Sequence, residues 1–115
     1  MTQEDKELLL KDLCARLPYG VIIQIKDWAV LDAELKLGHI NRLQINDVEL
    51  KPYLFPMSGM TDEQYKEYWE LEHSGNMEHL SIPALDWLNK NHFDYRGLIP
   101  MGLALDATNL NIYRL

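Results

Sequence analysis

Residues 20–27, GVIIQIKD, decide the fold, because the spacing of apolar side chains changes there from a helical period to an alternating one. Val21, Ile23 and Ile25 share one face of an extended chain, as expected for a half-buried β-strand. The alternation continues through WAVLDAELKL, residues 28–37, with a phase slip in its middle that indicates a bulge or a short turn. The inward side chains of this second run are expected to be Trp28, Val30, Ala33, Leu35 and Leu37.

A third strand is predicted over HINRLQIND, residues 39–47, with Leu43 and Ile45 facing the core. Connections as short as these allow only antiparallel pairing, since a parallel crossover needs a dozen or more residues. The next stretch, DVELKPYLFPMSGMT at 47–61, is predicted to run irregularly over the domain, because its two prolines interrupt regular structure. These features together predict a small antiparallel β-meander.

A helix is predicted before the strands, over residues 2–17, with its N-cap at Thr2. Leucines that recur every four residues form its apolar stripe, and Cys14 is expected to lie on that stripe as a small core side chain. Asp12 and Arg16 stand one turn apart and are assigned to the outer face as an i,i+4 ion pair.

Two further helices are predicted after the strands. The first begins with a capping box, the T-x-x-Q of residues 61–64, and the second begins at Ser81 or Ile82. The apolar segment GLIPMGLALDA, residues 97–107, is expected to complete the core or to form a subunit interface. The sequence thus predicts one α+β domain over residues 1–115: an N-terminal helix, a small antiparallel meander, two further helices and an apolar C-terminal segment.

Composition excludes several classes of function. The chain has 115 residues, 47% of them apolar and 25% charged, as in ordinary folded domains. Its 18 acids against 11 bases give a net charge of −7, which argues against binding to nucleic acids or anionic membranes. Neither a secretory leader nor an apolar stretch of membrane-spanning length is recognisable, and Cys14 has no second cysteine to pair with. We therefore expect an acidic cytoplasmic protein.

Motifs for metal, cofactor and nucleophilic chemistry are lacking. The four histidines include no pair at the i,i+4 spacing of helical zinc sites, and the single cysteine offers no metal pair. No serine lies in a nucleophile elbow, and neither a Walker loop nor a dinucleotide fingerprint is present. The sequence therefore predicts no metal and no cofactor, and it favours a protein that is not an enzyme.

The densest polar cluster lies in NHFDYRGLIP, directly after the last predicted helix. One interpretation places Asp94 and Arg96 in a cleft roofed by Trp87 and Tyr95, with His92 as an acid or base. The other makes the cluster a polar corner, in which Asp94 accepts backbone N–H groups of its own turn and Arg96 binds a carboxylate or carbonyls. We expect the second arrangement.

A candidate interaction surface is formed by apolar side chains in segments predicted to be irregular: Tyr53, Phe55 and Met101. The tail TNLNIYRL, residues 108–115, alternates apolar and polar residues, so it could add an edge strand to the meander or to a neighbouring chain. A homo-oligomer is therefore possible.

Three blocks carry a family resemblance: LLLKDLCARLPYGV from Leu8, KPYLFPMS-M from Lys51, and DWLNKNHFDYRGLI--GLAL from Asp86. They resemble a group of small uncharacterised proteins of gut Bacteroides and related bacteria, often associated with phage-like or mobile-element regions. The resemblance extends from Leu8 to about Leu105. It implies kinship but brings no activity, cofactor or catalytic residue, and the last residues of the chain do not match the pattern.

The leading hypothesis for function is a non-enzymatic cytoplasmic protein of phage or mobile-element type that binds another protein, whose identity the sequence does not give. The alternative is a small enzyme or ligand-binding domain that uses the His92–Arg96 cluster with Trp87. A third hypothesis, an acidic mimic of nucleic acid, would require carboxylates along one face at phosphate-like spacing.

Overall fold

A computed structural model describes residues 2–26, 29–46, 48–72 and 82–113. Helices and short strands are interspersed along the chain, with 3₁₀ turns at Leu17–Tyr19 and Met57–Gly59. The elements are α1 (Gln3–Arg16), β1 (Ile22–Lys26), β2 (Val30–Glu34), α2 (Leu37–Asn46), β3 (Glu49–Pro56), α3 (Asp62–Glu72), α4 (Ile82–Lys90), β4 (Phe93–Asp94) and β5 (Leu105–Asp106). The α+β class predicted from the sequence is confirmed.

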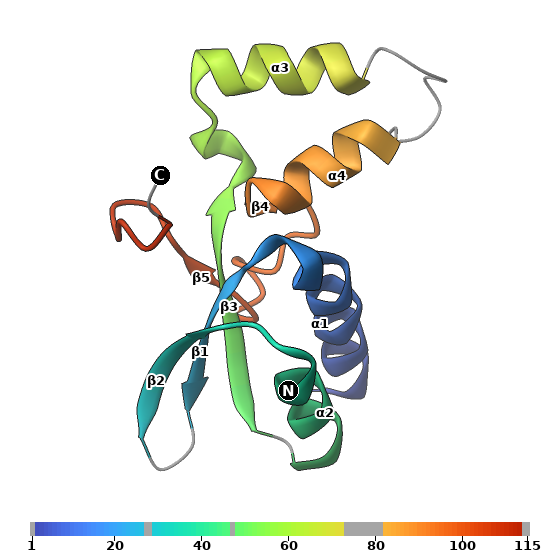
Figure 1. Ribbon diagram of the computed structural model, residues 1–115, viewed down its shortest axis with the longest axis vertical. Helices are drawn as coiled ribbons and strands as arrows, with labels where there is room; N and C mark the ends of the chain where they lie inside the picture. Colours follow the sequence, from blue (N-terminus) through green and yellow to red (C-terminus); the bar gives the residue numbers. More distant parts are fainter. Residues whose placement is uncertain (1, 27–28, 47, 73–81, 114–115) are drawn as a thin grey trace.

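The sheet is mixed, and its strands lie in the order β2-β1-β3-β4, with β5 also on β3. β1 lies between two antiparallel neighbours, with Ile23 opposite Ala33 of β2 and Pro52 of β3. The second half of β3 leaves β1 and pairs in parallel with β4 and β5. Figure 1 shows α1 and α2 on one side of this sheet, and α3 with α4 at one end of the molecule.

The prediction of a third strand over residues 39–47 is wrong, since α2 occupies Leu37–Asn46. Its apolar residues fit a helix better than a strand: Ile40 and Leu43 stand three positions apart and are both buried, whereas Ile45 is 78% exposed. The start of α2 is also capped locally, because the backbone N–H of Lys36 donates to His39 Nδ1 at 2.9 Å. The helical spacing of the buried residues and this cap favour a helix over the strand that the alternating apolar residues suggested.

The third strand is instead β3, which lies in the segment predicted to be irregular. Its two prolines stand where ladders end: Pro52 is the last residue paired with β1, and Pro56 is the last paired with β4. A proline lacks the N–H that a continuous ladder needs, so the ends of ladders tolerate it. The prolines therefore mark the change of partner and the end of the strand.

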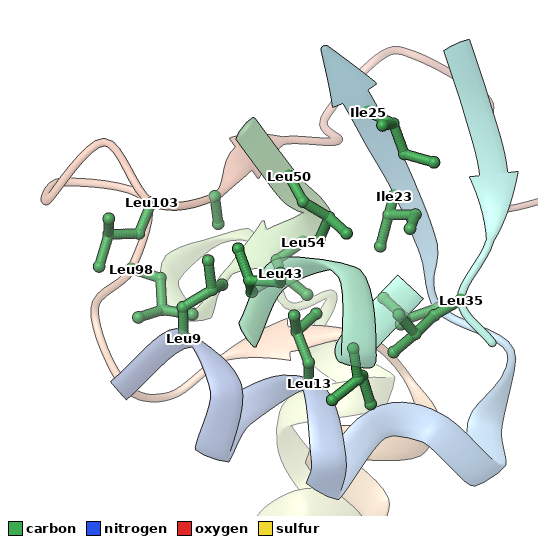
Figure 2. Packing of buried hydrophobic residues seen from close by; sticks show 13 residues of the cluster. Leu9, Leu13, Ile23, Ile25, Leu35, Leu43, Leu50, Leu54, Leu98 and Leu103 are labelled. Carbon is green, nitrogen blue, oxygen red and sulfur yellow. The ribbon is translucent and has the colours of Figure 1, made fainter. Parts of the chain in front are cut away.

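The main core lies between the sheet and helices α1 and α2. Figure 2 shows leucine side chains of the helices meeting isoleucines and leucines of β1 and β3, together with the loop after β4. Val21, Ile23 and Ile25 all contribute, which confirms the predicted face of the first strand. A second cluster joins α3, α4 and β4 through Tyr68, Trp87, Leu88 and Phe93.

Helix α1 follows the predicted bounds, and the Oγ1 of Thr2 accepts the backbone N–H of Asp5 at 3.0 Å as its N-cap. The buried face differs from the prediction, however. Cys14, expected in the core, is exposed, while Asp12 and Arg16, expected outside, are fully buried. The buried face of α1 keeps Leu9 and Leu13 and also includes these two polar side chains, which have partners inside the protein.

Two other residues expected to be buried lie at the surface. Val30 and Leu37 are exposed, although Leu35 is buried as predicted. Trp28 lies outside the described residues. The predicted edge strand of the tail does not form within residues 108–113, and the tail is instead held by the side chain of Tyr113. No helix in the described ranges is long and apolar enough to cross a bilayer.

Candidate functional site

The polar cluster begins where α4 ends. The backbone N–H of Asn91 still bonds to the carbonyl of Trp87 at 3.0 Å, but His92 adopts a left-handed conformation with φ 63°. Glycine is the usual residue at this position after a helix, because a β-carbon is disfavoured there. The His92 ring stacks on that of Tyr113, with centroids 3.8 Å apart and an interplanar angle of 15°.

Asp94 ties down the turn that follows it. Its Oδ1 accepts the backbone N–H of Leu98 and its Oδ2 accepts that of Ile99, both at 2.9 Å. The turn needs Gly97, whose φ of 74° lies in the left-handed region. The carboxylate is buried, and both of its oxygens accept backbone donors of this turn. Asp94 thus has the structural role expected of a polar corner.

Arg96 reaches a carboxylate on a distant element. Its Nη1 lies 3.3 Å from Asp12 Oδ1, and the other Asp12 oxygen accepts Arg16 Nε at 2.8 Å. Arg16 also donates from Nη2 to the carbonyl of Phe93 at 2.7 Å. Asp12 and Arg16 have no exposed side-chain surface. This buried network fastens α1 to the segment after α4.

Tyr95 lies between the two arginines. Their Cζ atoms are 5.2 Å (Arg16) and 4.7 Å (Arg96) from its ring centroid, within cation–π range. Its hydroxyl accepts Arg96 Nη1 and donates to Asn89 Oδ1, each at 2.9 Å. Tyr95 therefore belongs to the same network that holds Asp12.

The His92 imidazole is neutral at neutral pH. Burial, with a smaller contribution from the charge of Arg16, lowers the pKa of His92 to about 4. Its Nδ1 and the Nη1 of Arg16 are both buried without a hydrogen-bond partner among the described residues. Arg16 Nη1 is a donor, and Nδ1 can act as an acceptor only in the neutral imidazole, so the neutral form is the one compatible with its charged neighbour.

Trp87 is buried in the second core cluster. It stacks on Phe93 with centroids 5.6 Å apart and lies 5.9 Å from the Tyr68 ring. Tyr95 and Arg96 lie together in the buried network. The other three residues of the predicted cluster, Trp87, His92 and Asp94, each have different neighbours. A hollow of about 450 Å³ adjoins His92, and its described lining includes neither Asp94 nor Arg96.

The three residues of the candidate interaction surface, Tyr53, Phe55 and Met101, differ in their burial and do not form one surface patch. Tyr53 is buried, and its hydroxyl donates to Asp32 Oδ1 at 2.8 Å and accepts Gln24 Nε2 at 3.0 Å. Phe55 is half-buried against the rings of Phe93 and Tyr113. Met101 is exposed, on the rim of a second hollow of about 440 Å³ beside α1 and β3. Of the three, Met101 is the one available at the surface.

Sequence reasoning missed the roles of Asp12, Arg16 and Tyr113. The first two were detectable, because Leu9, Asp12, Leu13 and Arg16 follow the i,i+3,i+4,i+7 spacing of one helix face. No local signal marks Tyr113, whose hydroxyl accepts the N–H of Ile22, 91 positions away.

Among the described residues, no group of three His, Cys, Asp or Glu side chains is placed to hold a metal ion. Comparison with known proteins found no matching family model, curated protein or solved structure. The chain's own residues are therefore the basis for its function.

Proposed function

We propose that this chain is a non-enzymatic cytoplasmic protein of phage or mobile-element type that binds another protein. The resemblance of three sequence blocks to such proteins supports the biological setting. The roles of Asp94, Arg96 and Asp12 support the absence of catalysis by the polar cluster, because their charged groups bind the protein's own backbone and one another.

The observation that carries the proposal is an exposed aromatic pair on α3. Tyr65 and Trp69 stand four residues apart, so they share one helix face, and they are 59% and 49% exposed. Tyr68, three residues after Tyr65, is buried and packs against α4, so the exposed pair borders the face that α4 covers. Exposed tyrosine and tryptophan side chains are typical anchors of protein interfaces. Figure 1 shows α3 at the end of the molecule, with α4 on its inner side.

The charges of α3 indicate the chemistry of its partner. The helix has one base, Lys66, and five acids, which are Asp62, Glu63, Glu67, Glu70 and Glu72. A partner with Lys or Arg around an apolar depression would match both features. Two copies of this chain would bring acidic helices together, so self-association through this face is disfavoured.

Affinity capture from the native host, with purified protein as bait, tests the proposal. The wild-type chain and Leu110→Ala, a control at another exposed apolar residue, should retain the same protein. Trp69→Ala should weaken its binding by roughly 30-fold, as expected for an interface anchor. Binding should also weaken as salt is raised, because it depends on opposite charges. Equal capture by the wild type and Trp69→Ala would contradict the proposal.

A further inference from the structure

We propose that the hollow beside His92 binds a small planar anion, such as an aromatic carboxylate. The site goes beyond the proposed function and shares neither Tyr65 nor Trp69 with it. The hollow measures about 450 Å³, within the range of sites for small organic molecules. It lies between β1, β3, the first turn of α3, the end of α4 and the residues before the C-terminus.

The walls of the hollow are aromatic and held in place. Tyr113 is anchored by its hydroxyl, which accepts the N–H of Ile22 at 2.8 Å and donates to the carbonyl of Tyr53 at 2.7 Å. His92 stacks on this ring, and Phe55 lies 5.7 Å from it. Rings held in this way need little rearrangement to receive a flat ligand on the faces that they do not turn to each other.

The conformation of His92 also points to a ligand. A left-handed residue after a helix is most easily a glycine, yet here a histidine lies in that position and lines the hollow. Strained non-glycine residues concentrate at binding sites, where the surrounding structure holds them in place. The backbone carbonyl of His92 is itself held by the N–H of Phe55 at 2.8 Å. This hydrogen bond holds His92 and Phe55, which both line the hollow, next to each other.

The polar groups of the hollow favour an anion. Lys90 is the charged residue of its described lining, which contains no acid although the chain carries 18. Lys90 forms no ion pair within the described part of the chain, so its ammonium is available to a ligand. Gln64 uses its Oε1 to accept the N–H of Thr61 and keeps its amide N–H groups as donors. These groups suit a carboxylate attached to a flat ring.

Two-dimensional amide NMR of the full chain tests the site with three matched probes. They are naphthalene carboxylate, its neutral carboxamide and the naphthylmethylammonium cation. The carboxylate should shift the amide signals of Lys90, Asn91 and His92, with a Kd on the order of 1 mM or below. The carboxamide should bind more weakly and the cation most weakly, because only the carboxylate is attracted by Lys90.

A charge variant and its control complete the test. Lys90→Gln should weaken carboxylate binding about two- to fivefold and leave carboxamide binding unchanged, since one partly exposed charge contact is lost. Lys66→Gln removes an exposed charge from α3 and should change neither. Three results would each overturn the proposal: no saturable shifts up to about 10 mM carboxylate, shifts confined to other residues, or equal binding of the cation and the carboxylate.

Discussion

Replacing Asp12 with alanine should strongly destabilise the fold. The carboxylate is fully buried and accepts Arg16 Nε at 2.8 Å and Arg96 Nη1 at 3.3 Å. The variant leaves the buried Arg16 guanidinium without its counter-charge, which costs about 3–5 kcal/mol. That is a large part of the roughly 5–15 kcal/mol by which a domain is usually stable. With an m-value of about 2 kcal/mol per molar, the urea midpoint should fall by about 2 M.

The control is the exposed pair of Glu34 and Lys36, which has the same kind of contact without burial. Lys36→Ala should leave the urea midpoint unchanged within error, because solvent screens an exposed pair. The double variant Asp12→Leu/Arg16→Met should be less destabilised than Asp12→Ala, since it removes both buried charges. An Asp12→Ala midpoint equal to that of Lys36→Ala would refute the reasoning that burial makes this network strong.

Three further predictions concern the unfolding free energy. Tyr113→Phe keeps the ring but loses the hydroxyl bonds to two backbone groups, so urea titration should show a loss of about 1–3 kcal/mol. The unfolded chain binds a proton at His92 near pH 6.5, but the folded chain does so only near pH 4. The free energy of unfolding should therefore decline as the pH falls from about 6.5 to about 4, and it should decline less steeply in His92→Gln. Identical pH profiles of the two proteins would contradict the lowered pKa of His92. Thr61→Ala removes the acceptor of the Gln64 N–H at the start of α3 and should cost about 1 kcal/mol by thermal unfolding.

The starts of α1 and α3 could be predicted because their signals are local. In the capping box of α3, Thr61 Oγ1 accepts the Gln64 N–H at 3.1 Å and Gln64 Oε1 accepts the Thr61 N–H at 2.9 Å. Both partners lie within four residues, so their spacing alone identifies the cap. The N-cap Thr2 of α1 was predicted for the same reason, because its partner Asp5 lies three residues away. The buried face of the first strand was predicted from the alternation of its apolar residues.

The third strand could not be placed because its signals conflicted. Residues 39–47 contain apolar side chains that fit either an alternating or a helical spacing over so short a run. The prolines of β3 argue against a strand unless the points at which its ladders end are known, and those points depend on β1, β4 and β5. Local preference was therefore overridden by tertiary pairing.

The candidate site was predicted in part. Asp94 bonds to its own turn as expected, and Arg96 binds a carboxylate as expected, but that carboxylate belongs to Asp12, 84 positions away. Nothing near residue 96 indicates this partner. The hollow beside His92 depends in the same way on Tyr113, whose position no local pattern predicts.

The sequence by itself determined the α+β class, the N-caps of α1 and α3, and the first strand, because these depend on contacts within a few residues or on a repeating period. Only the tertiary structure decided which polar residues are buried. Arg16 meets the carbonyl of Phe93 across 77 positions, and its charge is tolerated inside because Asp12 lies on the same helix face. Burial of a charge requires its partners to be assembled, and only the folded chain assembles these.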